Sequence, residues 1–263
     1  MINTYKIVVA HPDDEILFFS SILKNSLQTI ICFGPSEDKD VTIGRQNLKT
    51  QIPLDNIFFL DLPESNVQDT ANWKKPQKTI EGIFVSKNSS SYKKNYDRLK
   101  AQLSKYIHYG ETIYTHNPWG EYGHEEHIQV FRVIMALAKD LNLKVCVNSY
   151  ISNKSYMLMT KEQHLLSSIA HIGVPNFNLT LTFKKLYQSN LCWTWHDDYC
   201  WPNLELFYEI DRSEKNIEIK NSKIPTYPLN MISGNYNTNI FKAMISKILP
   251  TKIKKLIKLL LKS

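Results

Sequence analysis

The chain has 263 residues, of which 43% are hydrophobic and 22% are charged. A chain of this length and composition can bury a sizeable core, which excludes a small scaffold that depends on disulfides. The formal net charge is +7, but residues 1–239 hold 25 basic and 25 acidic residues, so the excess lies entirely in residues 240–263. This distribution argues against a nucleic-acid-binding protein, which would spread Lys and Arg over its fold.

The four cysteines show neither a Cys-x-x-Cys motif nor zinc-ribbon spacing, and two of them fall within predicted strands. We therefore expect reduced thiols in a cytosolic protein. The chain enters its first predicted strand without a charged and apolar leader, and no apolar run is long enough to span a bilayer. The cysteines are Cys32, Cys146, Cys192 and Cys200.

The first motif lies between a predicted strand and a predicted helix. Residues 5–10 are β-branched and apolar, as in a buried parallel strand, and apolar residues from Ile16 to Leu23 recur with helical spacing. Between them, residues 11–15 supply one imidazole and three carboxylates at the strand end, where open α/β sheets bind ligands. One or two acids could simply cap the helix. A cation would offset the repulsion among the rest, so a metal site is the competing interpretation.

Residues 28–33 predict a second strand, which a polar loop at residues 34–40 follows at the same edge of the sheet. Arg45, just inside the next predicted helix, could reach an anionic or hydroxyl group of a substrate, or form an ordinary ion pair. A third strand is predicted at residues 57–62. Residues 64–94 show little periodicity, and we expect this insertion to form a loop over the pocket.

A second motif strengthens the interpretation of a metal site. Residues 111–116 predict a strand, residues 117–123 a loop, and residues 124–139 a helix whose first turn carries His124 and His127. Residues at i and i+3 are neighbours on a helix surface, so both imidazoles can face one crevice. The spacing excludes a zincin metalloprotease, which needs His at i and i+4 with Glu between them.

The later part of the chain changes character around Cys192–Trp201, a segment rich in aromatic residues. Aromatic rings beside amide and carboxylate groups make a good platform for a sugar, although each Trp could equally pack the core. The other predicted elements are helices at 97–107, 161–170 and 181–188 and strands at 145–150 and 204–210. The candidate substrate contacts are Arg45, Tyr122, Trp193, Trp195 and His196.

Residues 240–263 contain seven Lys and no acidic residue. Pro250 precedes a stretch in which Ile253, Leu256, Ile257 and Leu260 share one helical face and lysines the other. This pattern is typical of a basic amphipathic helix in the interface of an anionic membrane. A terminal helix docked on the domain or on a partner subunit is the alternative.

The two motifs together resemble the PIG-L/LmbE family of zinc-dependent N-deacetylases. The resemblance rests on Ala10-His11-Pro12-Asp13-Asp14-Glu15 and Gly123-His124-Glu125-Glu126-His127, with weaker likeness in Arg45-Gln46-Asn47-Leu48 and residues 57–63. It covers roughly residues 4–150. The resemblance implies a Rossmann-like, mostly parallel sheet flanked by helices, and one zinc ion held by His11, Asp14 and His127.

The resemblance further implies that Asp13 is the general base and that His124 stabilises the oxyanion or protonates the leaving amine. Many family members carry Pro-Asp between the two histidines, where this chain has Glu125 and Glu126. A Glu side chain reaches further than Asp, so the role of Glu126 beside the ligand His127 stays open.

The chemistry of hydrolysis asks for these residue types independently of the resemblance. Two His and one carboxylate leave a coordination position open, as in catalytic zinc sites. Zinc lowers the pKa of bound water toward 7, and Asp13, a carboxylate that is not a ligand, can take its proton. A protonated His124 would stabilise negative charge on the carbonyl oxygen. Another divalent metal such as Fe²⁺ is an alternative to Zn²⁺.

We therefore expect an α/β deacetylase domain in residues 1–239, followed by a basic amphipathic tail in residues 240–263. The expected reaction removes an N-acetyl group from an N-acetylated sugar, a (lipid-linked) surface-glycan precursor, at the cytoplasmic face of a membrane. Two alternatives stay open: an amidase acting on another N-acyl small molecule, and a non-catalytic glycan-binding protein of the membrane surface. Asp13 counts against the second, because a binding protein has no use for a base that is not a ligand.

Overall fold

A computed structural model of the chain describes residues 5–212 and 227–232. The predicted tail at residues 240–263 lies outside these ranges. The elements in chain order are β1 (Tyr5–Val9), α1 (Asp14–Phe18), α2 (Ser20–Leu23), β2 (Gln28–Phe33), α3 (Lys39–Leu48), β3 (Ile57–Leu62), β4 (Lys78–Thr79), β5 (Gly82–Ile83), α4 (Ser89–Leu103), β6 (Thr112–Thr115), α5 (Glu125–Leu141), β7 (Lys144–Asn148), β8 (Tyr150–Ile151), α6 (Tyr156–Glu162), a 3₁₀ turn (Gln163–Leu165), β9 (Leu166–Gly173), α7 (Phe177–Ser189), β10 (Glu205–Ile210) and β11 (Asn230–Met231).

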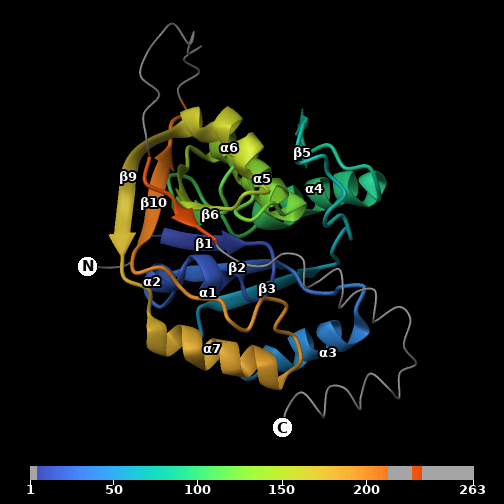
Figure 1. Cartoon of the computed structure of the whole chain (residues 1–263), viewed down its shortest axis with the longest axis vertical. Coiled ribbons are helices and arrows are strands. Elements are labelled where there is room, and N and C mark those ends of the chain that lie inside the picture. Colours follow the sequence, from blue (N-terminus) through green and yellow to red (C-terminus); the bar gives the residue numbers. More distant parts are fainter. Residues whose placement is uncertain (1–4, 213–226, 233–263) are drawn as a thin grey trace, which may run out of the picture. The chain divides into compact units, whose positions relative to one another are not determined.

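A seven-stranded sheet in the order β3-β2-β1-β6-β7-β10-β9 forms the centre of the fold (Figure 1). In this sheet the neighbouring strands β3, β2, β1, β6 and β7 are parallel. Strand β10 runs antiparallel to both β7 and β9. Val8 of β1 lies opposite Ile30 on one side and Thr115 on the other, so β1 is a central strand. The predicted α/β class with a mostly parallel sheet is confirmed.

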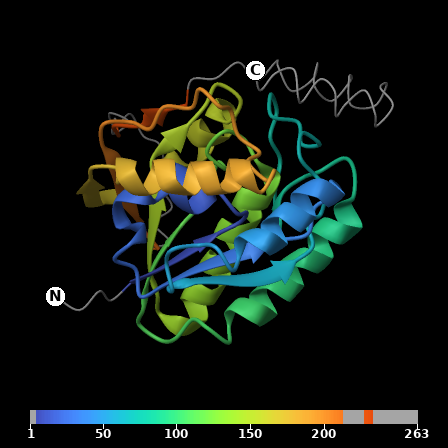
Figure 2. The same ribbon diagram turned by 90° about the horizontal axis from the view of Figure 1, so that it is seen from below.

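Helices cover both faces of the sheet, which explains why its central strands are apolar throughout. Figures 1 and 2 show α1, α2, α3 and α7 on one face and α4 and α5 on the other. The segments 7–10 and 30–33 are completely buried between these layers. Because β1 and β6 are parallel neighbours, the loops that follow them meet at one edge of the sheet.

Two segments predicted as helices have a different conformation or different bounds in the structure. Residues 161–170 do not form one helix: α6 ends at Glu162, and after the 3₁₀ turn residues 166–173 form the edge strand β9. Pairing with β10 decides this conformation, since tertiary contacts override weak local propensity. The helix predicted at residues 97–107 begins at Ser89, eight residues earlier, and ends at Leu103.

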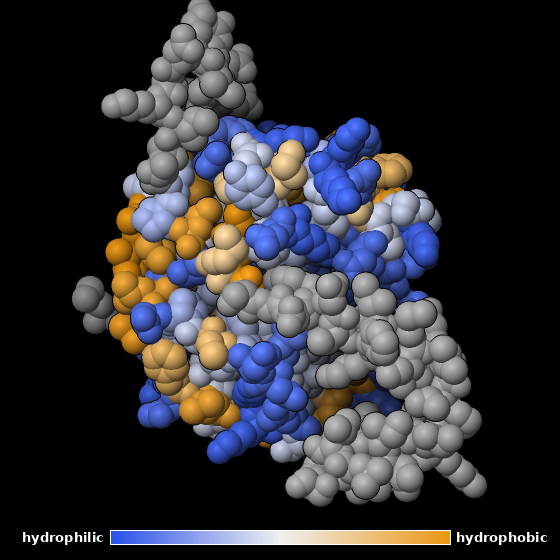
Figure 3. All heavy atoms as spheres, in the orientation of Figure 1, coloured by the Kyte–Doolittle hydropathy of each residue, from blue (hydrophilic) through white to orange (hydrophobic). Residues whose placement is uncertain are grey.

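The edge strand β9 presents apolar side chains to solvent. Ile169 is 47% exposed, Ile172 50% and the following Val174 62%. Figure 3 shows hydrophobic residues gathered at this side of the sheet. Within residues 5–212 and 227–232, no helix is long and apolar enough to cross a membrane.

The four cysteines are free thiols, as expected. Cys32 in β2 and Cys146 in β7 are buried strand residues, which confirms their predicted positions.

The first helix is broken at Phe19, and a buried carboxylate explains why the break is stable. Phe19 leaves the helical conformation at φ −136°, which frees the amides of Ser20 and Ser21 at the start of α2. Glu205 of β10, fully buried, accepts hydrogen bonds from both amides and from both hydroxyls at 2.6–3.2 Å. This contact joins the last part of the sheet to the segment that follows the first motif.

We predict that Glu205→Ala lowers the free energy of unfolding by about 3 kcal/mol, because it leaves the buried donors of Ser20 and the part-buried donors of Ser21 without their acceptor. Urea unfolding followed by circular dichroism measures this. Glu209→Ala on the same strand is the matched control, and since its side chain is 36% exposed we expect less than about 1 kcal/mol. Equal losses in the two variants would contradict the assigned role of Glu205.

Candidate metal centre

The two motifs of the sequence come together beyond the carboxyl ends of β1 and β6. His11 lies just beyond β1, and Asp13 directly precedes Asp14, the first residue of α1. His124 caps α5, and His127 lies in its first turn. All five side chains are buried, with exposed fractions of at most 6%. The crevice predicted from the strand order therefore contains the predicted residues.

Asp14 lies at the centre of the cluster. Its Oδ2 atom is 3.5 Å from Nδ1 of His11 and 3.3 Å from Nε2 of His127. Bonds of 2.0–2.1 Å to a tetrahedral metal separate neighbouring ligand atoms by about 3.4 Å. Each of the two distances is therefore compatible with Asp14 sharing a metal ion with that histidine.

His127 is held in the tautomer that a metal ligand requires. Its Nδ1 atom lies 2.7 Å from Oε2 of Glu121 and donates to this carboxylate. Its Nε2 atom is buried and has no hydrogen-bond partner within the described part of the chain. An unpartnered buried lone pair beside a carboxylate is where a cation fits.

Glu121 is itself fully buried and bound from several sides. It accepts hydrogen bonds from the amide of Asn117 at 3.0 Å and from Nδ2 of Asn148 at 2.5 Å. Burial raises its pKa, but His116 and His127 outweigh this and hold the pKa of Glu121 at about 2. Glu121 is therefore a permanent anion that orients the ligand histidine.

His116 is a further histidine of the cluster, and it was not predicted from the sequence. Together with Asp14 and His127 it forms a group whose ligand atoms lie within 4.8 Å of one another. However, its Nε2 atom accepts a hydrogen bond from the amide of Ala10 at 2.8 Å, so this lone pair is already used. The ring links β6 to the end of β1 and stacks on His127 at 3.9 Å between ring centres.

His124 forms another group of potential metal ligands with His11 and His127. The Nδ1 atom of His124 accepts a hydrogen bond from the amide of Glu126 at 3.2 Å and so caps α5. Burial, His11 and His127 all lower the pKa of His124 well below its usual value. The structure thus favours a neutral ring with a proton on Nε2, in contrast to the protonated ring expected from the sequence.

Glu126, whose role the sequence leaves open, contacts His11 and Ser65. Its Oε2 atom lies 2.9 Å from Nε2 of His11, and its Oε1 atom accepts from the amide of Ser65 at 2.5 Å. Burial lowers the pKa of His11, but hydrogen bonds to Asp14 and Glu126 outweigh this and raise it to about 10. The carboxylate orients His11 from the side away from Asp14, as Glu121 orients His127.

Glu125 binds the first part of residues 64–94, the insertion predicted to form a loop over the pocket. Its Oε1 atom accepts from the amides of Thr70 and Ala71 and from Nε1 of Trp73 at 2.9–3.2 Å. The predicted insertion at residues 64–94 also contains the hairpin β4–β5 and the start of α4. These contacts make its first part a fixed wall attached to α5.

Asp13 occupies a strained position. Its φ of 102° is in the left-handed region that disfavours a residue with a side chain. Its amide donates to Oε2 of Glu15 at 2.9 Å, which stabilises this conformation. Burial and the charge of Asp14 raise the pKa of Asp13 to about 7.

The predicted substrate contacts separate into two groups. The Tyr122 ring lies 5.2 Å from His127 and 4.4 Å from the Trp195 ring, so both aromatic residues border the cluster. Arg45 is buried and pairs with Glu64, which is 4.0 Å from His11.

The other two predicted contacts pack against aromatic neighbours. Trp193 packs against Tyr187 of α7, with 6.2 Å between ring centres, and His196 packs on Trp195 at 5.6 Å.

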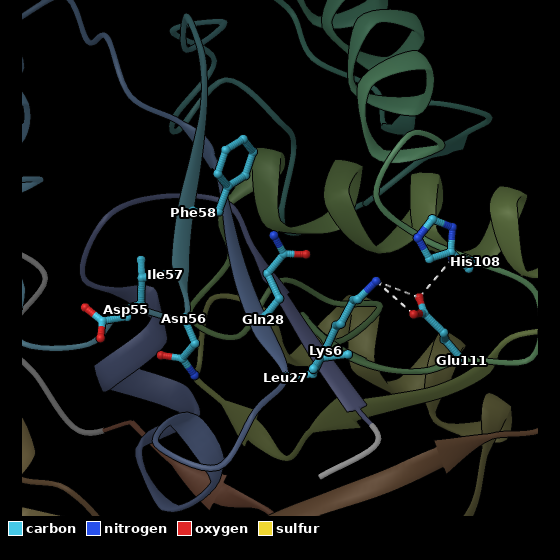
Figure 4. A pocket seen from close by; sticks show the side chains of 9 residues that line it. All are labelled: Lys6, Leu27, Gln28, Asp55, Asn56, Ile57, Phe58, His108 and Glu111. Carbon is cyan, nitrogen blue, oxygen red and sulfur yellow. Dashed lines mark hydrogen bonds and ion pairs between the residues drawn. The ribbon is translucent and has the colours of Figure 1, made fainter. Parts of the chain in front are cut away.

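A hollow of about 480 Å³ lies at the opposite end of the parallel strands (Figure 4). Lys6 and Glu111 line it and form an ion pair at 2.8 Å. Lys6 and Glu111 neutralise each other. The buried histidine cluster, whose ligand atoms lie close enough together to hold a metal ion, is the stronger candidate for chemistry.

A scan against known protein families and a search of curated proteins found no match.

We predict that the purified protein binds about one divalent metal ion, and that His11→Ala, Asp14→Ala and His127→Ala each lose most of it. Metal content after gel filtration, determined by mass spectrometry, measures this. Full occupancy in all three variants would rule out the ligand set.

Glu121→Gln should retain the site but weaken metal affinity about 10–100-fold, the usual effect of removing a partner that orients a ligand. Competition with a chromogenic chelator measures the affinity. Glu37→Gln, at an exposed position, is the matched control and should bind like the wild type.

Proposed function

We propose that this protein is a metal-dependent hydrolase that removes the N-acetyl group from an N-acetylated sugar. The observation that carries the proposal is the pair of consecutive aspartates in different environments. Asp14 lies between two imidazoles at ligand spacing, whereas the side chain of Asp13 has no histidine within ion-pairing distance in the described residues. The resemblance of both motifs to the PIG-L/LmbE family supports the same reaction.

His11, Asp14 and His127 would hold the ion. A divalent ion bound there activates water and polarises the amide carbonyl. Asp13 takes the proton of the attacking water, a task that suits a carboxylate whose pKa is raised to about 7. After the carbon–nitrogen bond breaks, the same proton can pass to the departing amine.

His124 provides the second catalytic group. Since its Nδ1 atom is used in capping α5, its Nε2 atom carries the proton and can donate to the carbonyl oxygen as negative charge develops. This role needs no positive charge on the ring. Such donors contribute about 10²–10³-fold to rates in other hydrolases.

The surroundings of the cluster suit a sugar. Tyr122 and Trp195 border it with aromatic surface, on which a pyranose ring can stack. Buried Arg45 has an Nε atom without a hydrogen-bond partner in the described residues, and it faces the same region as Glu64 and Asp13. A ring surface beside fixed charges offers both stacking and polar contacts to hydroxyl groups.

The test is acetate release from a panel of N-acetylhexosamine glycans by the metal-loaded protein. We expect Asp13→Asn to keep its metal but to lose at least about 10²-fold in turnover, as expected for a general base. Loss of metal from this variant, with turnover retained on the loaded fraction, would make Asp13 a ligand and would contradict the proposal. Acetate release that is absent from every glycan but present with another N-acyl compound would favour the amidase alternative.

We further propose that the basic tail at residues 240–263, which lies outside the described residues, binds anionic membrane surfaces on the cytoplasmic side. Each Lys near an anionic leaflet contributes about 1 kcal/mol, and burial of the Ile253, Leu256, Ile257 and Leu260 face adds apolar transfer energy. Binding of this kind would bring the enzyme to a lipid-linked glycan precursor.

Deletion of residues 240–263 should abolish sedimentation with anionic vesicles and leave metal content and turnover of soluble substrates unchanged. High salt should weaken binding of the intact protein without removing it, because salt does not screen the apolar contribution. The membrane proposal fails if the intact protein ignores anionic vesicles at low salt.

A further inference from the structure

The segment Cys192–Trp201 is attached to helix α1 by hydrogen bonds. Nε1 of Trp201 donates to the carbonyl of Ile16 at 2.7 Å, and the hydroxyl of Tyr199 donates to the carbonyl of Leu17 at 3.2 Å. A part of the chain that follows α7 thus lies against the helix that begins with the two aspartates.

Within this segment Thr194 reaches Asp13 itself. Its Oγ1 atom donates a hydrogen bond of 2.9 Å to Oδ2 of Asp13. No other donor in the described part of the chain binds the Asp13 carboxylate, so Oδ1 stays available. One oxygen is held and the other is free to accept a proton.

The two tryptophans that flank Thr194 pack against different parts of the fold. Trp193 packs against Tyr187 and lies 5.4 Å from the ammonium group of Lys184, both in α7. Trp195 packs against Tyr122 in the loop before α5. The alternation Trp-Thr-Trp therefore points the threonine at Asp13 while its neighbours anchor the segment.

Asp13 needs such a partner. Its amide is bonded to Glu15 and its backbone is strained, but neither feature involves the carboxylate. A single hydroxyl donor on Oδ2 selects one orientation of the carboxylate plane. A base that acts on a bound water must hold its accepting oxygen in one place.

We propose that Thr194 is a positioning residue for Asp13, and that its hydroxyl holds the carboxylate so that Oδ1 faces the reacting water. The inference rests on the proposed function, in which Asp13 is the base. Sequence analysis assigned the sugar contacts of this segment to Trp193, Trp195 and His196 and passed over the threonine between them.

The test compares Thr194→Val, which keeps the shape and removes the hydroxyl, with Thr194→Ser, which restores it. In the zinc-loaded protein we expect Thr194→Val to lower kcat about tenfold with KM unchanged, as for the loss of one hydrogen bond to a charged group. Thr194→Ser should recover most of the wild-type kcat. Thr182→Val, at an exposed position of α7, is the matched control and should leave kcat unchanged.

A second measurement is independent of turnover. Labelling aspartate with carbon-13 at the side-chain carboxyl gives an Asp13 resonance, which Asp13→Asn identifies by removing it. We expect Thr194→Val to shift this resonance and Thr194→Ser to return it toward the wild-type position, with metal content and melting temperature unchanged. An Asp13 resonance that is the same in wild type and Thr194→Val would overturn the inference, whether or not the protein is a deacetylase.

The two proposals fail differently. Absence of acetate release by the wild-type protein would reject the proposed substrate. The carbon-13 resonance of Asp13 would still show whether Thr194 bonds to the Asp13 carboxylate. A wild-type protein that is active, with a Thr194→Val variant of equal kcat, would reject the positioning role alone.

Discussion

The site depends on one electrostatic constraint: the carboxylate of Asp14 is buried among three imidazoles. Burial by itself raises the pKa of Asp14, but His127, His11 and His116 outweigh it and keep the group ionised. A buried charge of this kind is stable only if its partners are also fixed and hydrogen-bonded. Glu121 supplies that support behind His127, and Glu126 supplies it behind His11. The loop 117–123, the start of α5 and the insertion after β3 are therefore arranged around a single carboxylate.

The same constraint explains the unusual pair Glu125 and Glu126. Both carboxylates turn back from the helix start toward residues 65–73, where they accept from backbone amides and an indole nitrogen. The longer Glu side chain can bridge His11 and Ser65 at once, which joins the insertion to the ligand histidine. The Glu125-Glu126 pair thus attaches residues 65–73 to the start of α5.

Neighbouring aspartates receive opposite environments because the backbone turns between them. Asp13 is left-handed and Asp14 begins α1, so their side chains point in different directions from adjacent positions. The surrounding imidazoles lower the pKa of Asp14, whereas burial and the charge of Asp14 raise that of Asp13 to about 7. The proposed division of labour between ligand and base requires such a separation.

The sequence by itself determined the α/β class, the apolar strands of the sheet centre, and the two motifs that meet in the crevice. Those conclusions follow from local periodicity and from the rule that parallel strands end at one edge. Sequence analysis was wrong about residues 161–170, because pairing of β9 with β10 is a long-range contact that local propensity does not encode. Only the tertiary structure assigned His116, Glu121 and Thr194, because each acts through a partner distant in the chain or through a loop geometry that spacing does not reveal. Thr194 and Asp13 are 181 positions apart, and the packing of α7 and two tryptophans, which no local pattern specifies, brings them into contact.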